Sequence, residues 1–257
     1  MLKKVQKILS KKKRTPIVCL TSYSKAFAQV IDKYCDIILV GDSVANVLYG
    51  MKDTKNMTLD MMIKHTQSVK LGVKKSLLIV DMPRNTYKNK TEALKNAKKI
   101  INKTRCDGVK LESNYKNYNI IRHLVKAGIT VMGHIGFTPQ FKNRFRVSGN
   151  TTTEKNKLIN EAKKIEKAGA FSIVLECITA NVSKEITNQL KISTIGIGSS
   201  VNCDGQILVT DDILGLSGFY PKFIKKYANL DKVIEKGVQK YKSDVLKRRF
   251  PKKKNTY

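Results

Sequence analysis

Polar side chains follow several short apolar runs of this 257-residue chain, at the point where each run ends. They are Asp42 with Ser43, Asp81, Lys110 with Glu112, His134, and Glu176. The candidate ligands are mainly carboxylate oxygens, and the sequence has no C-x-x-C pair and no closely spaced pair of histidines. Such ligands indicate a hard cation, and Mg²⁺ fits best because water and substrate can complete its shell. Zinc is a poor match for such ligands. The sequence therefore predicts a cation site if these run ends meet in space.

Each of these residues also has an ordinary structural explanation. Asp42 and Ser43 could cap a helix or turn, and Asp81 before Met-Pro could belong to a turn. Glu112 could be a solvated loop acid, and His134 could be a hydrogen-bonded core histidine. Loops as a class favour polar residues, but five successive polar run ends favour one shared site over five separate accidents.

The elements that must position these residues are strands and helices in alternation, the pattern of an α/β protein with a parallel sheet. The predicted strands are 17–21, 37–40, 77–80, 108–111, 130–133, 171–175, 194–197 and 213–216. Between them, Leu94, Ala97 and Ile101 share one helical face, and the faces of two later helices stop at Gly128 and Gly169. Eight strands and crossovers in about 240 residues favour a (βα)8 barrel over an open sheet of fewer strands.

We expect residues 1–257 to form a single (βα)8 TIM barrel domain, with no internal repeat or linker to mark a second one. An amphipathic helix over residues 2–10 is expected to plug the bottom of the barrel. A helix over residues 230–245, with Val233, Val238 and Tyr241 partly apolar, is expected to close it. Basic segments 1–14 and 247–257 flank the domain.

The charge balance is strongly basic, with 50 Lys and Arg against 20 Asp and Glu and a net charge of +30. Such an excess suggests an anionic partner, such as nucleic acid or a membrane surface. Much of it lies in the acid-free segments 1–14 and 247–257, and the rest is spread over polar helix faces such as 91–100. We therefore predict solvated lysines and no dedicated nucleic-acid or membrane partner.

Cellular location is suggested by what the sequence lacks. No run approaches the roughly eighteen apolar residues of a membrane helix, and Met1-Leu-Lys-Lys4 lacks an apolar secretory segment. The five cysteines are an odd number without a C-x-x-C pair, which predicts reduced thiols, several of them in the core. We expect a cytoplasmic protein.

Nine stretches, in order and at matching spacing over about residues 15–223, resemble the 3-methyl-2-oxobutanoate (ketopantoate) hydroxymethyltransferase family of pantothenate biosynthesis. They are 20–23 (LTSY), 40–43 (VGDS), 81–83 (DMP), 109–112 (VKLE), 133–140 (GHIGFTPQ), 174–177 (VLEC), 195–198 (IGIG), 203–209 (CDGQILV) and 221–223 (PKF). The resemblance implies a TIM barrel of the phosphoenolpyruvate and pyruvate-binding type. It also implies a homo-oligomer, a decamer in the family.

The resemblance places Mg²⁺ on Asp42, Asp81 and Glu112. Ser43, with Asp42, Asp81 and Lys110, would hold the 2-oxo acid 3-methyl-2-oxobutanoate. Such an acid can chelate the cation through its keto and carboxylate oxygens, and the cation then stabilises charge on the keto oxygen when C3 loses a proton. Lys110 would add fixed positive charge beside that enolate.

The resemblance also makes Glu176 the proton acceptor and 5,10-methylenetetrahydrofolate the one-carbon donor. The enolate would attack the folate-derived methylene, and hydrolysis would give the hydroxymethyl product, ketopantoate. General-base catalysis of this kind contributes about a hundred- to ten-thousand-fold in rate. His134 is either a substrate contact or a support for the residues around it.

The chain departs from the family pattern at a few positions. Ser24 stands where the family has an acid, Ser113 and Asn114 stand for a pair of glycines, and Ser199 and Ser200 stand for Ala-Gly. None is a proposed ligand or base, so we expect the chemistry to be intact and any difference to act on folate binding.

Other hypotheses remain at this point. A 2-methylisocitrate or isocitrate lyase would also use a metal ion and an oxo acid, but the cysteine-bearing loop of those lyases is missing from this sequence. A barrel that binds an anionic partner through its basic termini would show steeply salt-dependent affinity, lost with residues 1–14 and 247–257. The intact set Asp42, Asp81, Lys110, Glu112 and Glu176 argues against a catalytically degraded family member.

Overall fold

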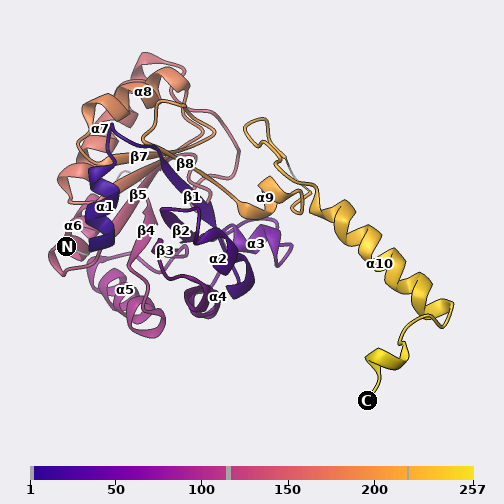
Figure 1. Ribbon diagram of the computed structural model, residues 1–257. Coiled ribbons are helices and arrows are strands. Elements are labelled where there is room, and N and C mark those ends of the chain that lie inside the picture. The colour runs from indigo at the N-terminus through magenta and orange to yellow at the C-terminus, as the bar shows by residue number, and fades with distance from the viewer. Residues whose placement is uncertain (1–2, 114–116, 219) are drawn as a thin grey trace. The chain divides into compact units, whose positions relative to one another are not determined.

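The fold is a closed barrel of parallel strands, seen in a computed structural model that describes residues 3–113, 117–218 and 220–257. Within these residues the strands follow one another around the barrel in chain order (Figure 1). They are β1 (Ile17–Thr21), β2 (Ile37–Val40), β3 (Leu77–Asp81), β4 (Gly108–Glu112), β5 (Val131–Gly136), β6 (Ser172–Glu176), β7 (Ser193–Ile197) and β8 (Gly205–Leu208). The predicted (βα)8 barrel is confirmed.

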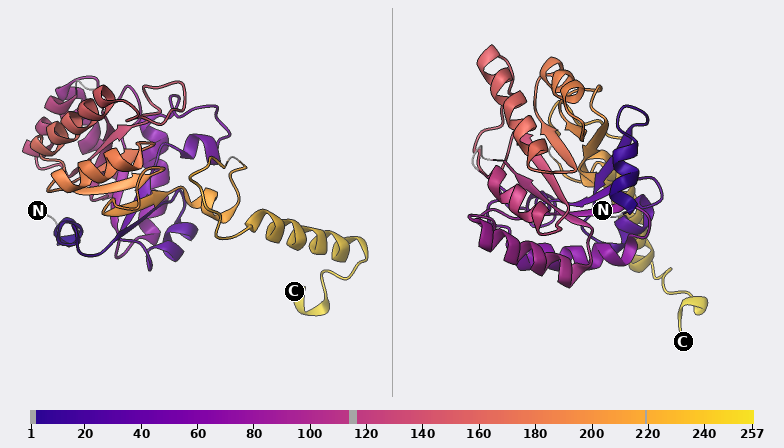
Figure 2. Two further views of the ribbon diagram at one scale, coloured as in Figure 1. Left: turned by 90° about the horizontal axis from the view of Figure 1, so that it is seen from above. Right: turned by 90° about the vertical axis from the view of Figure 1, so that its left-hand side faces the viewer.

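Within residues 1–209, helices follow most of the strands and lie outside them in both views of Figure 2. Those of the barrel are α1 (Lys3–Ser10), α2 (Lys25–Ile31), α3 (Val44–Val47), α4 (Leu59–Gly72), α5 (Lys90–Thr104), α6 (Tyr118–Lys126), α7 (Thr152–Lys167) and α8 (Ala180–Gln189). The predicted stops hold: α6 and α7 end two residues before Gly128 and Gly169, which have φ of +81° and +96°. Glycine adopts this left-handed conformation without strain, so it ends a helix at little cost.

The apolar cluster inside the barrel also includes the first helix. Val5 and Ile8 of α1 are buried in the same cluster as Ile17, Ile37 and Leu77, which begin their strands. The amphipathic helix predicted over residues 2–10 is described over residues 3–10, and there it covers the amino-terminal end of the barrel, as expected. This leaves the carboxyl ends of the strands as the open end, where TIM-barrel sites form.

The predicted eighth strand was wrong. Residues 213–216 overlap the short helix α9 (Thr210–Leu214), and the barrel closes through β8, which pairs with both β7 and β1. A Cβ on Gly205 would lie 2.5 Å from the carbonyl oxygen of Ile17, so this crowded position needs glycine. Gly205 and Gln206 break the apolar run that marks the other strands, and the sequence pattern therefore missed β8.

Several N-terminal lysines form ion pairs with the barrel. Lys11 Nζ lies 2.7 Å from Asp36 Oδ2, and Lys12 Nζ lies 2.6 Å from Asp204 Oδ2. Lys4 Nζ donates a 2.7 Å hydrogen bond to the Ser76 carbonyl. Part of the basic segment 1–14 is thus engaged within the fold, which argues against a free cationic arm there.

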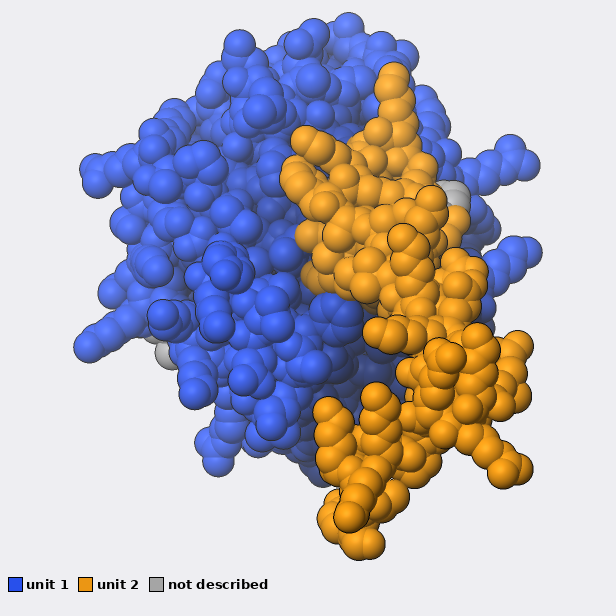
Figure 3. Space-filling model, turned by 45° about the vertical axis from the view of Figure 1, so that its right-hand side comes forward, with its two compact units in different colours: residues 1–209 blue, residues 210–257 orange. Residues whose placement is uncertain are grey.

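The chain divides into two compact units, residues 1–209 and 210–257, coloured separately in Figure 3. The second unit contains α9, α10 (Leu230–Leu246) and the 3-10 turn η1 (Lys253–Asn255). The helix predicted over 230–245 is confirmed as a helix, but none of its residues is buried. That it closes the barrel, and that residues 1–257 form one domain, stay predictions.

Two sequence expectations concern cysteines and membrane helices. All five cysteines are free and buried, as predicted. Across the part of the chain that the structure describes, no helix has the length and apolar character needed to span a bilayer.

Candidate active site

The residues singled out from the sequence gather at the carboxyl ends of five consecutive strands. Asp81, Glu112 and Glu176 are the last residues of β3, β4 and β6, and Asp42 follows the end of β2. His134 lies in β5 directly opposite Glu112 in the strand register. The expectation that the run ends converge is confirmed, because neighbouring parallel strands bring their ends to one edge.

Strand alternation explains why these side chains point inward. Residues two apart on a strand share a face. Met132 and Val174 belong to the apolar cluster inside the barrel, so His134 and Glu176, two residues further on, lie above them on the same face. The barrel interior is thus apolar at its base and polar at its open end.

A buried ion pair stands at the centre of the site. Lys110 Nζ lies 2.8 Å from Asp81 Oδ1, and both residues are at most 5% exposed. The second oxygen of Asp81 accepts a 3.0 Å hydrogen bond from the backbone N–H of Asp42. Burial raises the pKa of Asp81 to about 6, with Asp42 adding to the rise and Lys110 opposing it.

Lys110 stays charged although it is buried. Burial alone would lower the pKa of this amine, but the carboxylates of Asp81, Asp42 and Glu112 outweigh it and raise the pKa above its ordinary value. The pKa of Glu112 is also raised well above its usual range, first by burial and then by Asp42. The site therefore holds a surplus of buried carboxyl groups around one cation.

His134 links this cluster to Glu176. Burial, and then the charge of Lys110, lower the pKa of the imidazole well below its usual range, so the ring is neutral. Its Nδ1 lies 3.3 Å from Lys110 Nζ, which can only donate, so Nδ1 accepts and the ring proton is on Nε2. Nε2 lies 3.1 Å from Glu176 Oε2, although the two are not aligned as a hydrogen bond.

Glu176 is a buried carboxyl group with a raised pKa. Burial raises its pKa to about 7, against the opposing charges of Lys110 and Lys142. Its side chain keeps 18% exposure, so a small molecule can reach it from the open end of the barrel. A carboxylate with a pKa near neutrality is an efficient general base at physiological pH.

Two further groups organise the carboxylates, and the sequence assigned neither a role. The side chain of Gln140 donates to Asp42 Oδ2 at 2.8 Å, and its backbone N–H donates to Glu112 Oε2 at 3.0 Å. Tyr87 donates from its hydroxyl to Gln140 Oε1 at 2.5 Å. Gln140 lies in the loop after β5, and Tyr87 in the loop after β3, so no spacing rule connects them to their partners.

Ser43 occupies the N-cap position of α3 without making a side-chain cap hydrogen bond. Its hydroxyl instead lies 2.7 Å from the hydroxyl of Tyr23. The capping explanation for Ser43 therefore does not hold, and its hydroxyl faces a polar neighbour at the strand ends.

The site contains donor atoms of the type that a hard cation binds. Asp42, Asp81 and Glu112 supply carboxylate oxygens, and among the described residues Glu112 Oε1 is buried with no hydrogen-bond partner. No group of three His, Cys, Asp or Glu is arranged to hold a metal ion within residues 3–113, 117–218 and 220–257. Mg²⁺ needs only one or two carboxylates, because water and substrate oxygens complete its shell.

The departures from the family pattern have local structural roles. Ser24 caps α2 by accepting a hydrogen bond from the backbone N–H of Phe27. The hydroxyl of Ser113 donates to the buried carboxylate of Glu161, and the carbonyl of Ser200 accepts from the side chain of Gln206 at 2.8 Å. Ser199 lies 3.7 Å from the thiol of Cys203. Asn114 lies outside the described residues.

Comparison with known sequences gives one consistent result. The model of the protein family described as Ketopantoate hydroxymethyltransferase matches residues 3–253 of this chain. A 3-methyl-2-oxobutanoate hydroxymethyltransferase from Pelagibacter ubique (strain HTCC1062) is 51% identical over 257 residues, which cover 100% of both chains. One from Phenylobacterium zucineum (strain HLK1) is 44% identical, over 95% of this chain and 90% of that protein.

Comparison with solved structures bears on the fold. A phosphonopyruvate hydrolase, solved with oxalate and Mg²⁺, superposes with a TM-score of 0.62 over 99% of this chain and 93% of its own, at 10% identity. A 2,3-dimethylmalate lyase of the PEP mutase/isocitrate lyase superfamily gives 0.59 over 81% of this chain and 80% of its own, at 13% identity. At such identities the likeness establishes the barrel architecture alone.

Proposed function

The chain belongs to the ketopantoate hydroxymethyltransferase family and is a hydroxymethyltransferase, and on this premise we propose the co-substrate, the cation and the residues of its reaction. The 2-oxo acid is 3-methyl-2-oxobutanoate, and the one-carbon unit comes from 5,10-methylenetetrahydrofolate. The product is ketopantoate, for pantothenate biosynthesis. The observation that carries the proposal is Glu176, a carboxyl group of raised pKa beside a buried cation and a neutral histidine.

Glu176 is the base that removes the C3 proton of the 2-oxo acid. Its pKa of about 7 leaves it mostly ionised at slightly alkaline pH, yet basic enough to take a proton. His134 Nε2 lies 3.1 Å from Glu176 Oε2 without an aligned hydrogen bond, so the neutral ring packs against the carboxylate and adds no charge. Through this packing His134 limits where the base can lie.

The electron pair released from C3 moves onto the keto oxygen, and a fixed positive charge there lowers the barrier. Lys110 supplies that charge, because its amine stays protonated among the carboxylates. Mg²⁺ on Asp42, Asp81 and Glu112 would act as a Lewis acid that polarises the keto group. Ser43 then contributes a hydroxyl to the 2-oxo acid.

The folate step completes the reaction. The nucleophilic C3 attacks the methylene carbon of the co-substrate, so a carbon–carbon bond forms. The two bonds from that carbon to N5 and N10 of the folate break, and water supplies the hydroxyl group that takes their place. The proton that Glu176 took from C3 and the second proton of the water protonate the two nitrogens as tetrahydrofolate leaves, and the partial exposure of Glu176 lets its proton pass through solvent.

The test separates proton removal from one-carbon transfer. In D₂O with Mg²⁺ and without folate, the enzyme should exchange the C3 proton of 3-methyl-2-oxobutanoate, which NMR follows as collapse of the methyl doublet. Ketopantoate formation is then measured after adding 5,10-methylenetetrahydrofolate. Glu176→Gln should lower both rates by about a hundredfold or more, and chelation of Mg²⁺ should lower both in the unchanged protein.

Glu235→Gln is the matched control, because Glu235 is exposed on α10. It should keep both rates. Exchange without ketopantoate formation in the unchanged protein would refute the folate donor but keep the base. Full exchange in Glu176→Gln would refute the base.

Two further predictions accompany this proposal. We expect a homo-oligomer on the family resemblance, and a cytoplasmic location on the sequence.

A further inference from the structure

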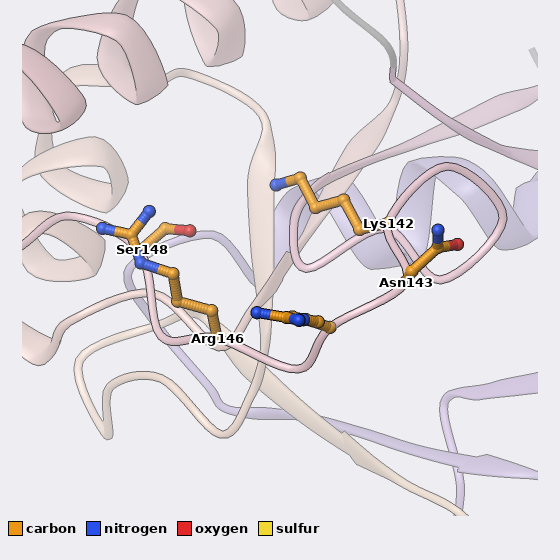
Figure 4. A pocket seen from close by; sticks show the side chains of 5 residues that line it. Lys142, Asn143, Arg146 and Ser148 are labelled. Carbon is orange, nitrogen blue, oxygen red and sulfur yellow. The ribbon is translucent and has the colours of Figure 1, made fainter.

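A pocket lined by cationic and polar side chains lies in the loop after β5. Its volume is about 430 Å³, and it is lined by Lys142, Asn143, Arg144, Arg146 and Ser148. In Figure 4 the side chain of Lys142 extends across the loop toward Arg146 and Ser148. We call these five residues the loop pocket.

The loop that carries the pocket is held beside Glu176 at both ends. It leaves the barrel at Gly136, which is opposite Glu176 in the strand register, and Lys142 Nζ donates to the Gly136 carbonyl. It returns as Ser148, whose N–H donates to the Cys177 carbonyl at 2.8 Å and which forms a bridge with Ile178. The loop pocket therefore lies next to the strand that ends in the proposed base.

Gly136 fixes the start of the loop. Its φ is +97°, and a Cβ there would lie 2.0 Å from the Glu176 carbonyl oxygen. The backbone of the loop and that of the base are thus in direct contact, and no residue but glycine fits between them. A ligand held in the loop pocket is positioned relative to Glu176 through this contact.

The cations of the pocket are only partly neutralised. Arg146 pairs with Glu154, which also accepts hydrogen bonds from the N–H groups of Gly149 and Asn150 and so holds the end of the loop. Arg144 is exposed and, among the described residues, has no ion pair. Half-burial lowers the pKa of Lys142, with the carboxyl of Glu161 opposing that effect. A surplus of positive charge in a preformed hollow is suited to a ligand with more than one carboxylate.

We propose that the loop pocket binds the glutamate carboxylates of the folate co-substrate, with preference for a tail of several γ-linked glutamates. The proposal rests on the proposed function, because it concerns the co-substrate named there. The methylene carbon of that molecule must reach C3 of the 2-oxo acid beside Glu176, so the rest of the molecule must leave over the rim of the barrel. The loop pocket lies at that rim, and each added glutamate brings one more carboxylate to it.

The experiment compares 5,10-methylenetetrahydrofolate carrying one glutamate with the same compound carrying three. The unchanged protein should show a KM about tenfold lower for the triglutamate, the size expected of one additional charge-assisted contact. Arg144→Glu should reduce that ratio to about two or less, with the loss falling on KM. Arg144→Lys should restore most of the ratio, and raising the salt concentration should reduce it in the unchanged protein.

Arg122→Glu is the matched control, because Arg122 is exposed on α6 and the charge change is the same. It should keep the ratio of the unchanged protein. The same comparison is made by calorimetry with 5-methyltetrahydrofolate carrying one or three glutamates, which cannot donate its carbon. This binding readout does not depend on turnover.

The outcomes distinguish the two proposals. If the unchanged protein makes ketopantoate but both tail lengths give equal KM and equal affinity, the loop pocket is refuted and the reaction stands. If Arg144→Glu and Arg122→Glu alter the ratio equally, general surface charge is responsible and the loop pocket is again refuted. If no folate supports turnover but the triglutamate still binds in an Arg144-dependent way, the donor proposal fails and the pocket stands.

Discussion

Buried Glu176 should lower the free energy of unfolding when it is ionised, so replacing it by glutamine should stabilise the fold at alkaline pH. The ordinary pKa of a glutamate here is 4.5, and burial raises that of Glu176 to about 7. Ionising this group within the fold at pH 8 therefore costs about 3 kcal/mol, at 1.36 kcal/mol for each pH unit between the two values. A glutamine side chain at this position has no proton to lose and avoids that cost.

The sign follows from proton binding. Between pH 4.5 and about 7 the folded protein keeps a proton on Glu176 that the unfolded chain releases, so stability falls as pH rises through this window. The advantage of Glu176→Gln should be near zero below pH 4.5, grow through the window and level off above pH 7. This is the stability cost expected of a carboxyl group withdrawn from water for catalysis.

Urea unfolding of the metal-free protein, with a chelator present, measures this directly. The unchanged protein, Glu176→Gln and the exposed control Glu235→Gln are compared from pH 5 to pH 8 at one protomer concentration, because subunit association would add to apparent stability. Glu235→Gln should show no pH-dependent gain. If the advantage of Glu176→Gln does not grow with pH, or if that variant is less stable at pH 8, burial does not raise the pKa of Glu176 as argued.

Two further results are expected. The kcat/KM for the 2-oxo acid should fall about tenfold for each pH unit below an apparent pKa near 7, because only ionised Glu176 accepts a proton; a pH–rate profile that is flat from pH 5.5 to 7.5 would rule Glu176 out as the base. Gln140→Ala removes the side-chain hydrogen bond to Asp42 and should weaken Mg²⁺ binding by about ten- to a hundredfold in calorimetry, as loss of a group that orients metal ligands does. Gln67→Ala, at an exposed position of α4, is its control, and equal Mg²⁺ affinity in the two variants would show that Gln140 does not orient the ligands.

Local patterns predicted most of the fold. Seven of the strands were found because strands buried on both faces are continuous apolar runs, and helices such as α7 show their buried residues Leu158, Ala162 and Ile165 at helical spacing. The eighth strand was missed because Gly205 is required by the nearby carbonyl of Ile17. That requirement comes from β1, the first strand of the chain, and no local pattern around Gly205 contains it.

Some residues of the candidate site could likewise be predicted from local sequence, and others could not. Asp81, Glu112 and Glu176 could be found from the sequence because each ends an apolar run, and the parallel sheet then brings the run ends together. Gln140 and Tyr87 could not, because their partners come from other loops of the barrel. Gln140 belongs to the stretch 133–140 that resembles the family, but the sequence does not show which groups its side chain and backbone N–H donate to.

The sequence by itself determined the barrel class, the position of the amino-terminal helix and the identity of the acidic and basic groups at the strand ends. Only the tertiary structure decided their chemical states. The pKa of Glu176 depends on burial and on Lys110 and Lys142, and the neutral form of His134 depends on burial and on Lys110. Burial and charge act through space over a few ångströms, so residues far apart in the chain set the properties of one group only after it has folded.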